Sequence, residues 1–329
     1  MLLNDLKLYN SFCRFTIYSV FLVICAGGFV RMTGSGMGCP DWPKCFGSWI
    51  PPTTIADLPV NYKEIYSDRG YDKLDFNVFN TWAEYLNRLL GALAGFFCFG
   101  LLLLSIKNWI NNSHQNSPQY SVHKNRHNKY LILFSIILVV LMAFQAWMGA
   151  LVVYSILSPF KITIHMFIAL LIVALLIFLY HYTAPESSQK KWPSIKTPWL
   201  IFAISILLIQ ILLGTQVRES IDTLLDSHNK ANIISQLPSI FNFHKTIALL
   251  VLFSNGIILF YYRQLIKQVL ELKAIIFIIC FLFCTGLFMN YQAFLGIYQW
   301  IHLISAVSLF MCQFSLLLKQ FDLPIPKFP

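Results

Sequence analysis

Long apolar stretches recur along the chain and are separated by short polar segments. A helix needs about 20 apolar residues to cross a hydrocarbon core of roughly 30 Å, and windows of that kind occur eight times. They lie near residues 12–31, 80–106, 130–154, 162–182, 198–217, 241–262, 273–291 and 296–318. The pattern predicts an all-α integral membrane protein with eight transmembrane helices, so that both ends of the chain lie on the same side.

The composition agrees with this prediction. Hydrophobic residues make up 57% of the 329 residues and charged residues 12%, whereas soluble domains carry about 25% charged residues. The first apolar window is longer than the core of a cleaved signal peptide and further spans follow it, so we interpret it as a transmembrane helix. We find no Arg- and Ser-rich transit peptide, which favours a bacterial plasma membrane over an organelle.

The formal net charge is +10, and its distribution predicts the orientation of the chain. The segments before the first window and after the second, fourth, sixth and eighth carry the whole excess of Lys and Arg. Basic loops stay in the cytoplasm, so we expect both termini to be cytoplasmic. A basic surface for nucleic acid is the alternative, and the one-sided distribution argues against it, so we expect no nucleic-acid partner.

Short strings recur in the same order four helices apart. FQAWMGA (144–150) resembles YQAFLGI (291–297), GGFVR (27–31) resembles GTQVR (214–218), and EYLNRLLGAL (84–93) aligns with FNFHKTIALL (241–250). Each unit holds an even number of helices, so both copies enter from the same side. We expect two parallel four-helix bundles related by a pseudo-two-fold axis, an N-terminal half of residues 1–190 and a C-terminal half of residues 191–329. Gly149 and Gly296 are predicted packing positions.

Five of the eight histidines fall in loops or at membrane edges, and three lie inside apolar windows away from those edges. His165, His244 and His302 fall in the first turns of helices that all begin on the outer face, where buried polar residues usually mark a function. A pair of imidazoles from two helices of a bundle suits the axial positions of a haem. Zinc would need three or four clustered ligands. A hydrogen-bonded interfacial histidine remains the alternative at each position.

A carboxylate, an amide and a guanidinium share one face of the second window. Glu84, Asn87 and Arg88 have helical spacing, and Arg88 can pair with Glu84 four residues away. The repeat places Asn87 opposite His244 and Glu84 opposite Phe241, so only the first half has an acid/base group there. A structural Glu–Arg pair at the membrane boundary is the alternative.

Two arginines and two cysteines lie near the same face. Arg31 and Arg218 occupy equivalent positions of the repeat, where each can reach a haem propionate or simply anchor its helix at the membrane surface. Cys39 and Cys45 follow the first span on the outer, oxidising side, where a disulfide can form. Glycines at 34, 36 and 38 permit sharp turns in this segment.

Taken together, these residues resemble the haem A synthase family over almost the whole chain. The matching segments are 27–52, 84–96, 145–153, 163–165, 214–222 and 301–306, together with the histidine of the sixth span. The resemblance implies an oxidoreductase acting on CH groups, which converts the C8 methyl of haem O to a formyl group by successive hydroxylations and supplies haem A to terminal oxidases. It assigns His244 and His302 as axial ligands of a resident haem b, and His165 and Glu84 to the substrate site.

One position departs from that family pattern. Many members have a histidine where this chain has Asn87, and an amide is a poor iron ligand. We expect His165 to be the one protein ligand of the substrate haem among the equivalent positions, with Asn87 facing an open iron position or a water positioned by Glu84. We expect Glu84 to take or relay a proton during the oxidation, and an equivalent cysteine pair is implicated in function in related members.

The resemblance also implies partners. These are haem O, a haem O synthase and a membrane electron donor or acceptor, and a homo-oligomer is left open. A bis-histidine b-type cytochrome that passes electrons between quinol and a partner is the main alternative. A transporter built from parallel repeats is a further one, although its polar groups should lie near the midplane of the membrane.

Overall fold

The computed structural model describes residues 2–113, 118–154, 159–184, 197–226, 236–291 and 295–321. Eight of its helices are long and apolar enough to cross a membrane, within these described residues. They are α1 (Leu2–Met32), α3 (Val78–Ser113), α4 (Pro118–Tyr154), α5 (Pro159–Tyr182), α6 (Thr197–Asp226), α8 (Ser239–Tyr261), α9 (Leu270–Tyr291) and α10 (Gly296–Leu318). The prediction of eight spanning helices is confirmed, whereas the predicted boundary at residue 190 lies outside the described residues.

Several helices are longer than the apolar windows that predicted them. The helix α1 begins ten residues before its window, and α4 begins at Pro118. Backbone hydrogen bonds continue a helix past the hydrocarbon core, where polar side chains are no longer excluded. Proline is well suited to a first helical position because its φ angle is already helical and the first N–H has no partner inside the helix.

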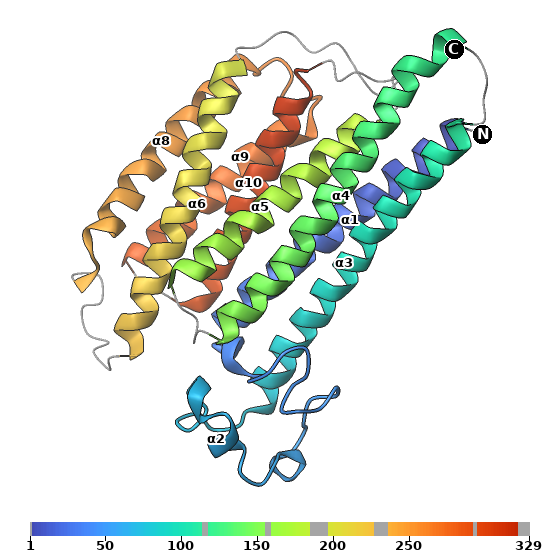
Figure 1. The fold of residues 1–329 in the computed structure, drawn as a ribbon. Helices are drawn as coiled ribbons and strands as arrows, with labels where there is room; N and C mark the ends of the chain where they lie inside the picture. Colours follow the sequence, from blue (N-terminus) through green and yellow to red (C-terminus); the bar gives the residue numbers. More distant parts are fainter. Residues whose placement is uncertain are drawn as a thin grey trace.

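The helices pack as two groups of four that meet along a shared face. In the first group α1 packs on α3 and α5, and α4 packs on α3 and α5; in the second, α6 packs on α8 and α10, and α9 on α10 and α8. Contacts of α1 with α10 and of α5 with α6 and α10 join the groups. Figure 1 shows α8 and α9 on one side of this shared face and α3 on the other. The helices at the shared face therefore form the core, and the outer ones expose more apolar surface.

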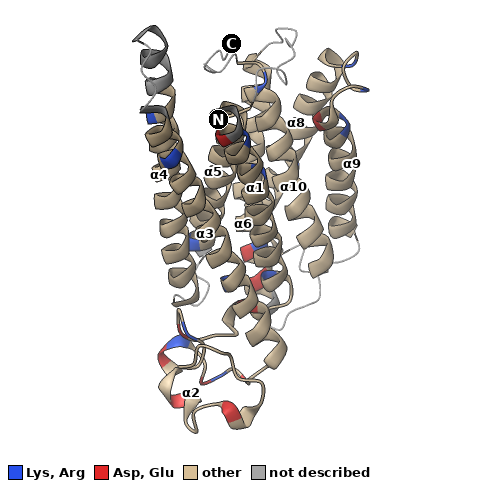
Figure 2. Ribbon diagram, turned by 90° about the vertical axis from the view of Figure 1, so that its right-hand side faces the viewer, with Lys and Arg blue, Asp and Glu red and all other residues tan. Residues whose placement is uncertain are grey.

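Charged side chains gather toward the two ends of the helices and in the segment that joins α1 to α3 (Figure 2). The middle parts of the helices carry almost none. Apolar side chains there have no hydrogen-bonding needs, and a helix satisfies its own backbone groups, which a membrane interior requires. The observed distribution fits a multi-pass membrane protein.

Residues 33–77, here called the cap, fold into a small body beyond the ends of α1 and α3 (Figure 1). The cap contains η1 (Ser35–Met37), η2 (Ile55–Asp57), α2 (Tyr62–Ile65) and η3 (Ser67–Arg69). Its core is the ring of Phe46, whose centroid lies 5.8–5.9 Å from those of four surrounding aromatic rings in edge-on geometry. These rings belong to Tyr62, Tyr66, Tyr71 and Phe76. Edge-on aromatic packing of this kind stabilises the cap.

Two of the predicted glycine turns have different physical causes. Gly34 has a φ of 68°, which side chains other than glycine resist. Gly38 has an ordinary φ of −79°. Position 38 requires a glycine for steric reasons, because an added Cβ would lie 2.3 Å from the carbonyl oxygen of Asn80. The backbone of the cap can therefore lie directly on the start of α3.

Candidate functional site

The three predicted histidines lie toward the cap end of their helices, each against a glycine of a neighbouring helix. A methyl group added to the glycine would lie 3.3–3.6 Å from the Cε1 atom of the imidazole. The pairs are His165 of α5 with Gly149 of α4, His244 of α8 with Gly214 of α6, and His302 of α10 with Gly286 of α9. A bare backbone at these points lets each ring approach the adjacent helix closely. The Oδ1 atom of Asn87 in α3 lies 3.8 Å from the corresponding point on Gly27 of α1.

These pairs correct one detail of the predicted repeat. The string YQAFLGI was expected within the seventh span, yet α9 ends at Tyr291 and Gly296 is the first residue of α10. Gln292 lies outside the described residues. Gly286, rather than Gly296, stands to His302 as Gly149 stands to His165. Gly296 instead packs closely on Met32 of α1.

The two histidines of the second group face each other. The ring centroids of His244 and His302 are 6.4 Å apart and their planes are inclined at 60°. The Nδ1 atom of His302 lies 2.8 Å from the hydroxyl of Thr285. The Nε2 atom of His244 lies 3.3 Å from the side-chain amide of Gln210, while its Nδ1 is buried without a hydrogen-bond partner among the described residues.

The first group holds several buried polar atoms that no described residue satisfies. The Nδ1 of His165 and the Oδ1 of Asn87 are two of them. Gln145 of α4 donates to the backbone oxygen of His165 at 3.1 Å, which fixes the start of α5 and leaves the imidazole itself free. Most buried polar groups in folded proteins have a partner, so these atoms mark a place for a ligand.

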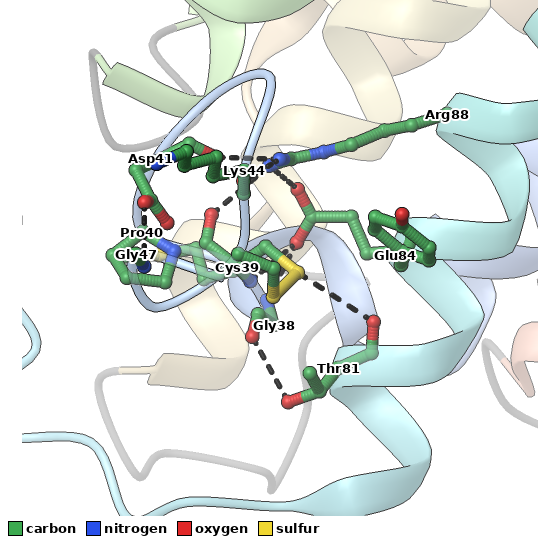
Figure 3. The surroundings of a disulfide bond; sticks show 12 residues. Gly38, Cys39, Pro40, Asp41, Lys44, Gly47, Thr81, Glu84 and Arg88 are labelled. Atoms are coloured by element: carbon green, nitrogen blue, oxygen red, sulfur yellow. Dashed lines mark hydrogen bonds and ion pairs between the residues drawn. A yellow bond between two sulfur atoms is a disulfide. The ribbon is translucent and has the colours of Figure 1, made fainter. Parts of the chain in front are cut away.

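Glu84 fastens the cap to α3 (Figure 3). Its Oε2 accepts hydrogen bonds from the backbone N–H groups of Gly38 and Cys39, at 2.6 and 3.0 Å. Its Oε1 is paired with Arg88 one turn further along the helix. The carboxyl side chain is 5% exposed, and a buried carboxylate requires such partners. The predicted Glu84–Arg88 contact is therefore present, and the cap amides are partners that the residue spacing did not indicate.

Arg88 completes this attachment from the same helix. It donates to the backbone oxygens of Cys39 at 3.0 Å and Lys44 at 3.2 Å, and also to that of Asp41. Cys39 and Cys45 form a disulfide that closes this turn. The structure thus brings Glu84, Arg88 and both cysteines into one cluster over the first turns of α3. Asn87 makes no hydrogen bond through its Oδ1 with any described residue, so the expected link to Glu84 stays a prediction.

Arg31 and Arg218 meet at a carboxylate that the sequence reasoning missed. Asp222 of α6 accepts Arg31 of α1 at 3.1 Å through one oxygen and Arg218 at 2.8 Å through the other. Arg218 also donates to Gln299 of α10. The four-residue spacing of Arg218 and Asp222 was a usable signal, but the approach of α1 is not visible in the sequence. Asp222 therefore ties the two helix groups together near the cap.

Groups in the cap itself also depart from their ordinary ionisation. Burial raises the pKa of the Tyr71 hydroxyl, which therefore stays protonated and donates to the backbone oxygen of Met37 at 2.7 Å. Hydrogen bonds from the backbone N–H groups of Thr53 and Thr54 lower the pKa of Asp57. The Tyr71 hydrogen bond joins the end of the cap to η1 at its start, and the hydrogen bonds of Asp57 order the turn before α2.

The fold and the partly buried imidazoles define a polytopic α-helical membrane protein with one pair of facing histidines and a third histidine toward the same end of its helices. The chain belongs to the family described as cytochrome oxidase assembly protein (COX15-CtaA), whose model matches residues 10–319.

Several curated relatives are similar to parts of the chain. The Heme A synthase of Shewanella oneidensis is 26% identical over 203 residues, which are 61% of this chain and 54% of the relative. That of Pelagibacter ubique is 30% identical over 218 residues, 63% of this chain and 60% of the relative. That of Ehrlichia canis is 31% identical over 169 residues, 48% and 44% of the two chains. The chain therefore spans about half the length of the curated relatives that it matches.

Proposed function

We propose that this chain is a haem A synthase, which oxidises the C8 methyl group of haem O to a formyl group through successive hydroxylations and so makes haem A for terminal oxidases. Membership of the family and the names of the relatives support this activity. The observation that carries the proposal is the pair of partly buried imidazoles of His244 and His302, whose ring centroids lie 6.4 Å apart. A third partly buried imidazole, that of His165, lies in the other helix group.

The chain is organised as two related halves, residues 1–190 for the substrate and residues 191–329 for a resident cofactor. The separate packing of α1, α3, α4 and α5 and of α6, α8, α9 and α10 supports this division. The repeated pairing of a glycine with an imidazole or amide supports a pseudo-two-fold relation between parallel bundles. Both termini lie in the cytoplasm, and the cap lies on the oxidising side, in agreement with its disulfide.

The second half suits a haem b. Its donor set is two imidazoles from two helices of the same group, one with a buried Nδ1 that has no partner among the described residues, and each imidazole lies beside a glycine of another helix. Within the described residues, no group of three or more His, Cys, Asp or Glu side chains is arranged so that it could hold a metal ion by itself. His244 and His302 would be the axial ligands, with Arg218 toward a propionate. The haem supplies one-electron redox chemistry when bound.

The first half would hold the substrate haem O. His165 offers one imidazole, and the amide of Asn87 and the guanidinium of Arg31 complete the polar side chains that we assign there. Glu84 is the proton acceptor, and its hydrogen-bond pattern favours Oε1 as the atom that takes the proton. Its Oε2 is committed to two backbone amides, whereas Oε1 is paired with Arg88 alone. Arg88 keeps its bonds to the backbone oxygens when Oε1 takes a proton.

The substrate would come from a haem O synthase, and the oxidation requires a membrane electron acceptor or donor. Assembly as a homo-oligomer is compatible with the apolar side chains that α3, α4, α8 and α9 expose. We assign no specific partner beyond these classes.

Pigment analysis tests the proposal. The chain is expressed with a source of haem O in a host that has no haem A synthase, and the extracted haems are separated by chromatography. We expect haem A, and we expect none when the His165→Ala variant replaces the wild type. Haem b alone in the wild-type protein would instead favour an electron-carrying cytochrome.

A further inference from the structure

The hydroxyl of Thr285 in α9 has three possible hydrogen-bond partners. It lies 2.8 Å from the Nδ1 of His302, 2.7 Å from the backbone oxygen of Phe281 and 3.1 Å from that of Leu282. A hydroxyl has one hydrogen to donate, and backbone oxygens can only accept. A threonine in a helix commonly donates to the carbonyl four residues earlier, which here is Phe281.

The number of hydrogens available for these contacts indicates which ring nitrogen of His302 is protonated. If the hydroxyl donates to a carbonyl, it can accept the N–H of His302 Nδ1, and both contacts are satisfied. If it donates to Nδ1 instead, the short contact to Phe281 O has no hydrogen. The hydrogen therefore resides on Nδ1, and Nε2 carries the lone pair.

The other two histidines lack this support. The Nδ1 atoms of His165 and His244 are buried without a partner among the described residues. The residue before the glycine that faces each ring explains the difference. It is Thr285 at Gly286, Met148 at Gly149 and Leu213 at Gly214. Only the first of these side chains can hydrogen-bond an imidazole.

We infer that Thr285 is a positioning residue that fixes the tautomer and ring orientation of His302, so that this imidazole presents Nε2 as a ready-made ligand for the resident haem. The inference rests on the proposed haem b site. It also gives a reason why the proposed haem b stays bound and the substrate haem leaves. The imidazole of His302 is oriented before haem b binds, whereas that of His165 becomes oriented only when the substrate haem binds. A hydrogen bond from the second ring nitrogen also makes a ligating histidine more basic.

Four variants of the full-length protein test the role of the hydroxyl. Thr285→Val removes the hydroxyl and keeps the β-branched shape, Thr285→Ala removes both, and Thr285→Ser keeps the hydroxyl. Thr16→Val is the matched control, because Thr16 of α1 is also buried and donates to the carbonyl four residues earlier, at 2.9 Å. Haem b content, the rate of haem transfer to apomyoglobin, and the haem b midpoint potential are measured for each purified protein.

We expect Thr285→Val and Thr285→Ala to lose haem about 10-fold faster or more, in line with other residues that hydrogen-bond a ligating histidine. Their midpoint potential should rise, because a less basic ligand stabilises the ferric state less. A tenfold selective loss of ferric affinity corresponds to about 59 mV for a one-electron couple. Thr285→Ser and Thr16→Val should match the wild type.

Wild-type values of retention and potential in Thr285→Val or Thr285→Ala would overturn the inference. An equal change in Thr285→Ser would also overturn it, because packing rather than the hydroxyl would then be responsible. If Thr285→Val does not accumulate, the comparison of alanine with serine still decides. Wild-type protein without any haem b would refute the proposed function itself, which is a different outcome.

Discussion

Replacing Glu84 separates its observed contacts with the cap from the proton transfer that we propose for it. Glu84→Ala removes the acceptor of two backbone N–H groups and the counter-ion of Arg88. Breaking a buried pair from one side costs about 3–5 kcal/mol, and the pair is well buried, with side chains 5% and 12% exposed. We expect Glu84→Ala to cost about 3 kcal/mol, the lower end of this range, because Arg88 retains backbone acceptors in the cap. The cap should then detach from α3 in a measurable fraction of molecules.

Glu84→Gln is the sharper variant. Its amide oxygen can still accept from Gly38 and Cys39, and only the charged bond to Arg88 is lost, at a cost of about 2 kcal/mol. We expect the cap to stay attached, yet haem A production to fall as far as in Glu84→Ala, because an amide cannot take the proton. Haem b should stay bound in both variants, and haem O or a hydroxylated intermediate should accumulate.

Two assays on the same preparations read these effects. Limited proteolysis within residues 33–77 reports the attachment of the cap, and chromatography of extracted haems reports the product. Glu271→Gln is the control, since Glu271 is a partly buried carboxylate bonded to Ser315 and Lys319 at the opposite end of the helices. A normal yield of haem A from Glu84→Gln would refute the role of Glu84 in proton transfer. Unchanged protease resistance in Glu84→Ala would refute its role in attaching the cap to α3.

Three further perturbations have defined outcomes. Asp222→Asn should lower the free energy of unfolding by about 1 kcal/mol, because its partly exposed ion pairs are screened by solvent, while haem b is retained; loss of haem b would contradict this. Cys45→Ser should destabilise the cap by about 2 kcal/mol, the loop-closure value for a short ring, seen as faster proteolysis. The pKa of Asp57 is lower in the folded turn than its ordinary value of about 3.9, so the ionised carboxylate stabilises this turn above that value. Proteolysis near residues 53–57 should therefore accelerate as the pH falls through the pKa of the folded state. A pH-independent rate in the wild type would contradict this role.

The spanning helices were predictable because a membrane imposes a length and an apolar composition that a sequence displays directly. The helix ends were not, because the polar first turns of α1 lie outside the hydrocarbon and resemble any soluble segment. The buried histidines were visible for the same reason as the spans: an ionisable side chain stands out in an apolar window. Arg88 beside Glu84 followed from helical spacing alone.

The missed features depend on how the helices are rotated against one another. No spacing indicates that Asp222 receives Arg31 from α1, or that Thr285 points to His302. The partners of Glu84 are backbone amides of Gly38 and Cys39, which every residue but proline has, so side-chain patterns cannot select them. The misplaced equivalence of Gly296 has a similar cause, because a short string of matching letters does not distinguish a helix interior from a connection.

The central claim is that the second half holds a permanent haem between His244 and His302 while the first half turns over its own. The most direct measurement is the haem b content per chain of purified wild type and of His302→Ala and His165→Ala, all produced without a supply of haem O. The account predicts one haem b in the wild type and in His165→Ala, and none in His302→Ala. A colourless wild type, or haem b that survives in His302→Ala and disappears in His165→Ala, would contradict it.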